Sequence, residues 1–368
     1  MNRLLHWCLN EKSVDSAEVA NDMKDLSKQQ GAWTKMTRWT GLVLLCACFC
    51  LLGNQAVPTV SAAEMTRTIS EGDNFFPKGT LLLRNVPYVN DGHERHTLDL
   101  FVPEHEGKIP LLVWIHGGAW VWGDKNDPSF YRFVKQGYAV ASINYRLSQH
   151  AVFPAQILDC KSAIRWLKAH APEYGIDPKR VGVGGASAGG HLASLVAATG
   201  ESREFDKGDN LDQSSRVDAV CDFFGPVDFE RYEFEATSIK LGDPNNPFVK
   251  LMGGIDLSSG STNLIRDLKL DDEKRALIRS AEAISQVTEK HPPIIIFHGN
   301  KDDLVPSNQS EYYLEALREK GVESSLYIVN GAGHGFDGPN IWRLISIFFD
   351  KHLKPEKKVG YKELLLEP

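Results

Sequence analysis

The sequence lacks the patterns by which metals, nucleotides and nucleic acids are usually bound. It has no H-E-x-x-H or C-x-x-C spacing, so no metal site is expected. It has no Walker loop, and Gly182-x-Gly184 lacks the later acidic partner of a dinucleotide site. The net charge is -7 and no useful basic run occurs, which argues against a nucleic-acid partner. We therefore expect no cofactor and no nucleic-acid partner.

The sequence also lacks an apolar run long enough to span a bilayer comfortably. The apolar run 41–53 is preceded by Lys35 and Arg38 and followed by the small residues of Ser61-Ala62-Ala63. This order is that of a signal peptide cleaved before Glu64, and an uncleaved anchor is the alternative. We expect a secreted or periplasmic protein without a stable membrane span after cleavage.

The segment before the apolar run is polar and aperiodic, and Met36 would open a signal peptide of ordinary length. We therefore expect 1–63 to be an N-terminal extension and signal peptide, with Met36 as the true start, and 64–368 to be the folded domain. Cysteine is scarce in that domain, where Cys160 and Cys221 alone remain of the six in the chain. Both lie in apolar periodic segments, so burial as small hydrophobic residues is favoured over a disulfide.

Apolar strand patterns alternate with helical patterns along the domain. The expected strands are 81–86, 96–101, 111–116, 138–145, 181–184, 217–224, 293–298 and 324–329, and the expected helices are 154–170, 189–198, 309–320 and 341–353. The first two strands flank the turn 90–92 and are expected to be antiparallel. The alternation predicts an α/β fold with a mostly parallel sheet covered by helices on both faces. The stretch 227–279 lacks a strong strand pattern and is expected to be a small cap insertion, with a plain surface excursion as the alternative.

Ser187 stands at the apex of Gly184-Gly185-Ala186-Ser187-Ala188-Gly189-Gly190, directly after an apolar strand pattern. Strand, sharp turn and helix around a serine form the G-x-S-x-G nucleophile elbow. Gly185 and Gly189 would let the strand and the helix pass close together. The alternative is a glycine-rich turn that cradles a phosphate.

A serine nucleophile needs a base and an acid that orients the base, and these follow it in the chain order Ser, Asp, His. His334 lies in a glycine-flanked loop after the strand 324–329, and Asp302 follows the strand 293–298. Asp303 is adjacent and competes for the acid role, but the register against Val305-Pro306 favours Asp302.

The nucleophile also needs backbone N–H donors for the oxyanion. Ala188 follows the serine, and Gly117 and Gly118 follow the strand 111–116 in an H-G-G-type turn in which Ala119 replaces a third glycine. His116 is expected to be structural rather than catalytic.

Five aromatic or basic residues near these motifs carry weaker signals. His191 lies one turn into the elbow helix, and Tyr145-Arg146 is expected to contribute a structural ion pair. For Trp120 and Trp122, an aromatic binding pocket and buried packing are equally open.

Six motifs in order carry a resemblance to a known family: HGGAW (116–120), NYRL (144–147), FPAQILDCKSAIRWLKAH (153–170), GASAGGHLA (185–193), HGNKDDLVP (298–306) and GAGHGF (331–336). Together they resemble the esterase/lipase branch of the α/β hydrolases, nearest to the feruloyl and acetylxylan esterase-like (BD-FAE-like) and hormone-sensitive-lipase-like groups. The resemblance covers about 80–353. It implies an eight-stranded sheet, the triad Ser187, Asp302 and His334, and oxyanion donors at Gly117, Gly118 and Ala188.

The sequence therefore predicts a serine carboxylesterase that works through an acyl-enzyme on small-molecule or polysaccharide-linked esters. Acetyl or feruloyl esters are the favoured substrates. This expectation rests only on the expected compartment and on the family resemblance. An aryl formamidase or peptidase of the same fold is the alternative, and a non-catalytic binding protein is a further one. Fold-level likeness alone does not decide among them.

Overall fold

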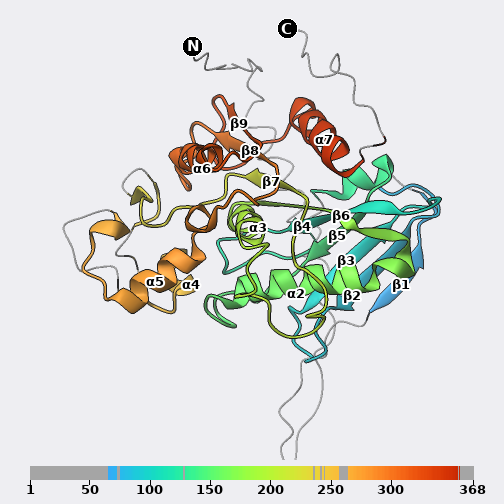
Figure 1. Ribbon diagram of the computed structural model, residues 1–368, viewed down its shortest axis with the longest axis horizontal. Coiled ribbons are helices and arrows are strands. Elements are labelled where there is room, and N and C mark those ends of the chain that lie inside the picture. Colours follow the sequence, from blue (N-terminus) through green and yellow to red (C-terminus); the bar gives the residue numbers. More distant parts are fainter. Residues whose placement is uncertain are drawn as a thin grey trace, which may run out of the picture. The chain divides into compact units, whose positions relative to one another are not determined.

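The computed structural model describes residues 65–356 except 73–74, 127–128, 235–236, 241–242, 244, 257–263 and 355 (Figure 1). The predicted signal peptide and extension (1–63) lie outside the described residues.

A nine-stranded sheet runs through the described part in the order β1-β2-β3-β5-β4-β6-β7-β8-β9. The strands are β1 (Thr66–Ile69), β2 (Leu81–Pro87), β3 (Thr97–Val102), β4 (Ile109–Ile115), β5 (Ala139–Ile143), β6 (Ile176–Ala186), β7 (Ala219–Phe223), β8 (Ile294–Gly299) and β9 (Ser324–Val329). Strands β1 to β3 pair antiparallel at one edge, β3 pairs antiparallel with β5, and the strands from β5 to β9 are parallel. The predicted α/β class and mostly parallel sheet are confirmed.

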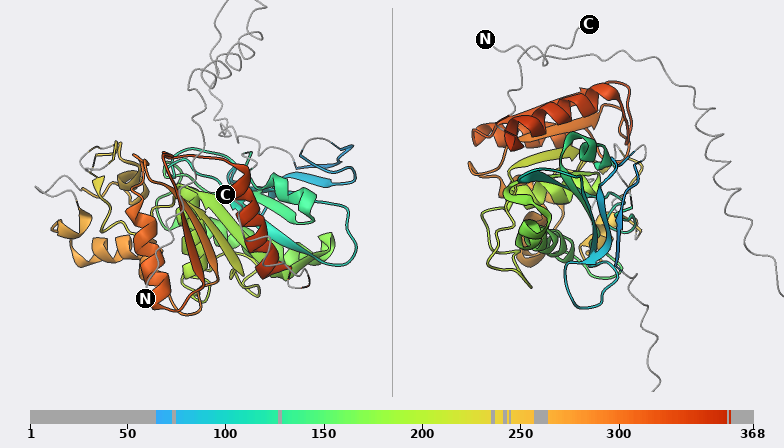
Figure 2. Two further views of the ribbon diagram at one scale, coloured as in Figure 1. Left: turned by 90° about the horizontal axis from the view of Figure 1, so that it is seen from above. Right: turned by 90° about the vertical axis from the view of Figure 1, so that its right-hand side faces the viewer.

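Two layers of helices cover the sheet (Figure 2). The helices are α2 (Ala155–His170), α3 (Ala188–Ala198), α4 (Pro247–Leu251), α5 (Asp272–Ala281), α6 (Asn308–Glu319) and α7 (Pro339–Leu353). Helices α2, α3 and α6 pack on one face with strand residues such as Val113 and Ile296. Helix α7 packs on the other face with strand residues such as Leu112 and Phe297. Strands β3, β4, β5, β7 and β8 are buried on both faces. This explains why central strands such as β4 and β8 read as continuous apolar runs.

The two cysteines of the domain are both buried and free. Cys160 of α2 joins the core on one face of the sheet, and Cys221 of β7 joins the core on the other face. The sheet separates the two thiols, so the predicted burial without a disulfide is confirmed.

The sheet has one strand more than the eight that the resemblance implied. Strand β1 is the extra one, and all four of its residues are exposed. Its polar sequence Thr-Arg-Thr-Ile gives no apolar run, because an edge strand that buries no face needs none. It therefore carries no signal that sequence periodicity can detect.

The stretch expected as a cap, 227–279, contains the short helix α4 and most of α5. Asp271 caps α5, since its side chain accepts the N–H of Lys274. Phe229 and Phe248 from this stretch join the core over α3. Within the described ranges, no helix is both long and apolar enough to cross a membrane.

Candidate active site

Ser187, Asp302 and His334 each follow the carboxyl end of a parallel strand. Ser187 follows β6, Asp302 follows β8 and His334 follows β9. Because these strands are parallel, their carboxyl ends lie at the same edge of the sheet, where open α/β folds bind ligands. The structure thus brings three segments that are distant in sequence to one edge.

The backbone of Ser187 takes an unusual conformation at the start of α3. Its φ is 56° and its ψ is -122°, and its N–H donates to Phe223 O at 2.8 Å. A Cβ at Gly189 would lie 2.1 Å from Ile115 O, and one at Gly185 would lie 2.3 Å from Gly189 O. Both glycines are therefore required for β4, β6 and α3 to approach, as the elbow pattern predicts.

The three side chains form one hydrogen-bonded chain. His334 Nε2 lies 2.9 Å from Ser187 Oγ, and His334 Nδ1 lies 2.7 Å from Asp302 Oδ2. The carboxylate only accepts, so Nδ1 carries the proton and Nε2 is left to accept the serine hydroxyl proton. This arrangement can activate the hydroxyl as a nucleophile.

Both carboxylate oxygens of Asp302 accept hydrogen bonds. Its Oδ1 accepts the N–H groups of Leu304 and Val305, each at 2.9 Å. Burial raises the pKa of Asp302, but hydrogen bonds from His298 and His334 outweigh it and hold the pKa well below its ordinary value. The carboxylate therefore stays charged beside the imidazole.

Asp303, the competing residue, is exposed, and its backbone carbonyl accepts the N–H of Ser238. The structure brings Asp302 and not Asp303 to His334.

Residues 116–123 contain Gly117 and Gly118, two of the expected oxyanion donors, and are named here the oxyanion turn; they lie against the elbow. A Cβ at Gly117 would be 3.5 Å from Ser187 Cβ, so this turn borders the serine. Gly118 has a φ of 109°, and Ala119 has a φ of 50°, which shows that alanine occupies a left-handed conformation there. Ala188 is the first residue of α3, so its N–H has no acceptor within the helix.

Strained backbone is concentrated around the elbow. Non-glycine residues with positive φ in the described part are Asn85, Ala119, Trp120, Ser187, Asn210 and Phe224. Four of these six belong to the oxyanion turn, the elbow or the end of β7. Such clustering is typical of functional sites, where the surrounding structure enforces rare conformations.

The two tryptophans of the oxyanion turn differ in their surroundings. Trp120 is buried, and its Nε1 donates to His191 Nδ1 at 3.1 Å. Trp122 is 68% exposed. His191 is fully buried and its other nitrogen bonds Ala281 O at 2.7 Å, so this histidine packs and joins three segments.

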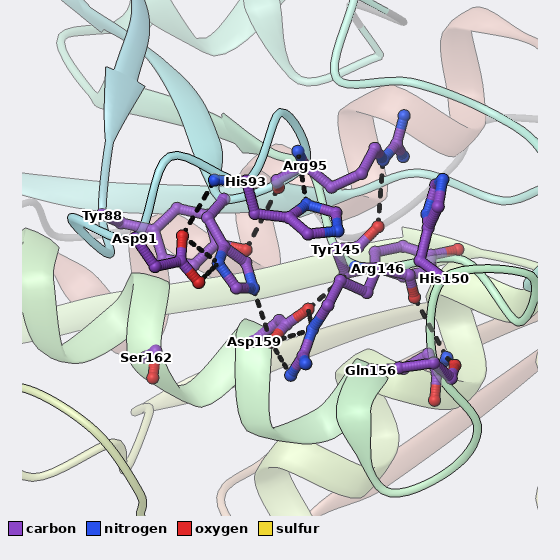
Figure 3. Close-up of polar contacts among 12 residues, drawn as sticks. Tyr88, Asp91, His93, Arg95, Tyr145, Arg146, His150, Gln156, Asp159 and Ser162 are labelled. Carbon is purple, nitrogen blue, oxygen red and sulfur yellow. Dashed lines mark hydrogen bonds and ion pairs between the residues drawn. The ribbon is translucent and has the colours of Figure 1, made fainter. Parts of the chain in front are cut away.

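The expected ion pair at Arg146 is present and structural. Arg146 Nη2 lies 2.7 Å from Asp159 Oδ1 (Figure 3). Asp159 also bonds His96. These groups join α2 to the β2–β3 loop and do not contact Ser187 or His334.

Three residues that contact the site had no predicted role. His298 Nε2 lies 3.3 Å from Asp302 Oδ2, and the Phe224 ring lies 4.6 Å from that of His334. Arg95 contacts His116 of the oxyanion turn. His298 lies in a recognised motif, whereas nothing around Arg95 in the sequence marks it.

The described residues offer no arrangement of three or more His, Cys, Asp or Glu side chains that would hold a metal ion. The groups at the site suit proton transfer and hydrogen bonding.

Comparisons with known proteins give one matching family model and several similar esterases. Residues 98–317 match the protein-family model BD-FAE. Over 232 residues the chain is 31% identical to Esterase LipC of Mycobacterium tuberculosis, covering 62% of this chain and 53% of that protein. The chain spans about half the length of the curated relatives it matches.

Two solved structures are similar over about three quarters of this chain. A truncated form of a carbohydrate esterase from gut microbiota is 29% identical with a TM-score of 0.66, covering 77% of this chain and 99% of that one. A bifunctional GH43-CE protein of Bacteroides eggerthii is 33% identical with a TM-score of 0.62, covering 73% of this chain and 38% of that one.

Proposed function

Since the chain belongs to the BD-FAE family, we propose that it is a serine carboxylesterase whose nucleophile is Ser187, whose base is His334 and whose orienting acid is Asp302. The observation that carries this proposal is the hydrogen-bonded chain from Ser187 Oγ through His334 to Asp302. The strained elbow and the glycine-rich turn beside it supply further support.

In the first half-reaction, Ser187 Oγ attacks the ester carbonyl carbon while His334 Nε2 takes the hydroxyl proton. The negative charge that develops on the carbonyl oxygen is stabilised by backbone N–H groups, for which Gly117, Gly118 and Ala188 are the proposed donors. The carbon–oxygen bond to the alcohol then breaks, and the leaving alkoxide takes the proton from His334. The acyl group remains on Ser187.

In the second half-reaction, His334 accepts a proton from water as the water oxygen attacks the acyl carbon. The bond to Ser187 Oγ breaks, Oγ regains the proton from His334, and the carboxylic acid leaves. Asp302 remains a carboxylate throughout and stabilises the imidazolium.

We propose esters of carbohydrates, with acetyl or feruloyl acyl groups, as the substrates. A carbohydrate esterase is among the similar structures. Trp122, beside the proposed oxyanion donors, exposes 68% of its surface and offers a flat apolar face to a sugar or feruloyl ring.

The test is a substrate panel assayed with wild type and Ser187→Ala. The panel comprises acetylated xylo-oligosaccharides, a feruloyl ester, aryl acetate and butyrate, and an aryl formamide. We expect the highest kcat/KM on a carbohydrate or feruloyl ester, and a fall of about 10⁴-fold or more in Ser187→Ala. Full activity of Ser187→Ala would overturn the mechanism, and turnover no better than that of aryl acetate would overturn the substrate class.

We also propose that the protein is exported, on the leader pattern of 1–63. The intact mass of protein recovered from the periplasm or medium is expected to match a chain that begins at Glu64. Recovery of the full-length chain from the cytoplasm alone would contradict export.

A further inference from the structure

Arg95 is a buried arginine behind the oxyanion turn. It lies in the loop before β3, is 8% exposed, and is drawn with its neighbour Tyr145 in Figure 3. Its Nε donates to Tyr145 O at 3.1 Å, and its Nη1 lies 3.3 Å from Asp124 Oδ2. Its Nη2 lies 2.9 Å from His116 Nε2 and 3.1 Å from Gly123 O. One nitrogen of Arg95 thus contacts both ends of the oxyanion turn.

The contact with Arg95 determines which nitrogen of His116 carries the proton. A guanidinium has only donors, so His116 Nε2 must accept. The proton then lies on Nδ1, which donates to Gly117 O at 2.7 Å. Burial and the neighbouring Arg95 cation lower the pKa of His116 to about 4, so the imidazole is neutral at ordinary pH. Tyr145 stacks on this ring at 4.4 Å between centroids.

The hydrogen bond to Gly117 O sets the direction of the next N–H group. In a trans peptide the C=O and the N–H point in opposite directions, so the N–H of Gly118 points away from His116. Both residues of this peptide are glycines, whose backbone dihedral angles are less restricted than those of other residues, so the orientation of the peptide depends on its contacts. The donor to Gly117 O is one contact that favours a single orientation of the Gly118 N–H.

Gly123, at the other end of the oxyanion turn, packs against the same hydrogen bond between His116 and Gly117. A Cβ at Gly123 would lie 2.4 Å from Gly117 O and 2.5 Å from His116 Nδ1. Gly123 thus packs directly over the bond between His116 and Gly117, and its own carbonyl accepts from Arg95.

We propose that Arg95 is a positioning residue for ester hydrolysis, which fixes the proton of His116 and both ends of the oxyanion turn so that the Gly118 N–H is held ready for the oxyanion. This inference rests on the proposed function, because it assigns a task to a group that supports the oxyanion donors. Arg95 itself contacts neither Ser187 nor His334.

The test compares Arg95→Met with Arg146→Met, a matched control. Arg146 belongs to the neighbouring network, and the side-chain hydrogen bonds that the structure gives it all go to Asp159. Removal of one oxyanion donor lowers kcat about 10²–10³-fold, so a donor that is misdirected for part of the time is expected to lower kcat about 10–100-fold. In Arg95→Met we expect this fall in kcat, with KM within about threefold of the wild-type value. In Arg146→Met we expect kcat within about twofold of wild type. Both values of kcat are calculated per folded protein.

Inhibition by a trifluoromethyl ketone provides a second readout, because its tetrahedral adduct carries the oxyanion. Its Ki is expected to rise in Arg95→Met in parallel with the fall in kcat, and to stay unchanged in Arg146→Met. Equal kcat and Ki in the two variants would overturn the inference. If Arg95→Met does not fold, Arg95→Lys replaces it. We then expect kcat to fall at least about threefold while KM stays near the wild-type value. A wild-type kcat in Arg95→Lys would overturn the inference.

Ser187→Ala separates this outcome from failure of the proposed function. If Ser187→Ala abolishes hydrolysis while Arg95→Met behaves as its control, only the role of Arg95 is overturned. If Ser187→Ala keeps full activity, the proposed mechanism is overturned as well.

Discussion

Ser187 keeps a backbone conformation that side-chain-bearing residues rarely adopt, with a φ of 56°. Such a conformation costs about 1–3 kcal/mol and persists only where its surroundings enforce it. Here the enforcing contacts are the hydrogen bond to Phe223 O and the close approach of Gly189 to β4. The result is a serine hydroxyl held 2.9 Å from the imidazole before any substrate arrives.

Asp302→Asn is expected to lower kcat about 10³–10⁴-fold, because an amide cannot hold His334 in the tautomer that accepts the serine proton. Asp303→Asn is the matched control, since Asp303 is exposed and is not the residue bonded to His334. The kcat for aryl acetate hydrolysis is measured for both variants. Comparable losses in the two variants would mean that the acid has been assigned wrongly.

Glu282 gives a prediction about pH and stability. It is 2% exposed and accepts from Glu230 N and Ser285 Oγ. Burial, the largest cause, raises the pKa of Glu282 from 4.5 to about 7. Between these values the folded protein holds a proton that the unfolded chain releases, so this group weakens the fold as the pH rises through that window.

Glu282→Gln has no titratable carboxyl group at this position, so its unfolding free energy lacks this dependence on pH. Each pKa unit corresponds to about 1.4 kcal/mol, so its unfolding free energy relative to wild type is expected to improve by roughly 1–3 kcal/mol from pH 5 to pH 8. Denaturant unfolding at the two pH values measures the gap. A difference in unfolding free energy that stays constant with pH, or that shifts in favour of wild type as the pH rises, would argue against a raised pKa.

The candidate site residues could be predicted from sequence because each stands directly after an apolar strand in a short motif. Local pattern places Ser187, Asp302 and His334 at the carboxyl ends of strands, and parallel pairing then brings them together. Arg95 could not be predicted, because its partners His116 and Gly123 belong to another segment and burial of its charge leaves no periodic trace.

At the scale of helices and strands, α3 packs so closely on β4 at Gly189 that no side chain fits between them. Gly189→Ala would place a Cβ 2.1 Å from Ile115 O, so α3 must move away from β4. We expect a loss of at least about 2 kcal/mol in unfolding free energy, as for an overpacked core, together with loss of most hydrolytic activity.

Gly338→Ala is the control for this substitution. Gly338 has an extended φ of 168°, and a Cβ there would meet only Ile341 Cδ1 at 3.9 Å. Its unfolding free energy is expected to change by less than about 0.5 kcal/mol. Thermal unfolding compares the variants, and equal stability of the two would contradict the crossing described here.

The strands of the sheet were predicted where they bury at least part of their surface, and the one fully exposed strand was missed. β4, β7 and β8 are fully buried and read as apolar runs. β1 is fully exposed and was missed. The same physical reason accounts for both results, since periodicity in a sequence reports burial and not backbone pairing.

On the scale of the whole molecule, the family match and the candidate site do not have the same limits. The match covers 98–317, which includes Ser187 and Asp302 but ends before His334. Strand β9 and helix α7 also lie beyond it. The proposed base therefore comes from the part of the chain that follows the matched segment.

The sequence distance within the candidate site has a consequence for how activity arises during folding. Ser187 and His334 are 147 residues apart, and their contact requires β9 to be paired on β8. Closing a long loop is slow compared with forming local helices. In refolding from urea, we expect helical circular dichroism to return before hydrolytic activity, and simultaneous recovery would contradict this. The ability to cleave an ester would then serve as a reporter for the last long-range step of folding.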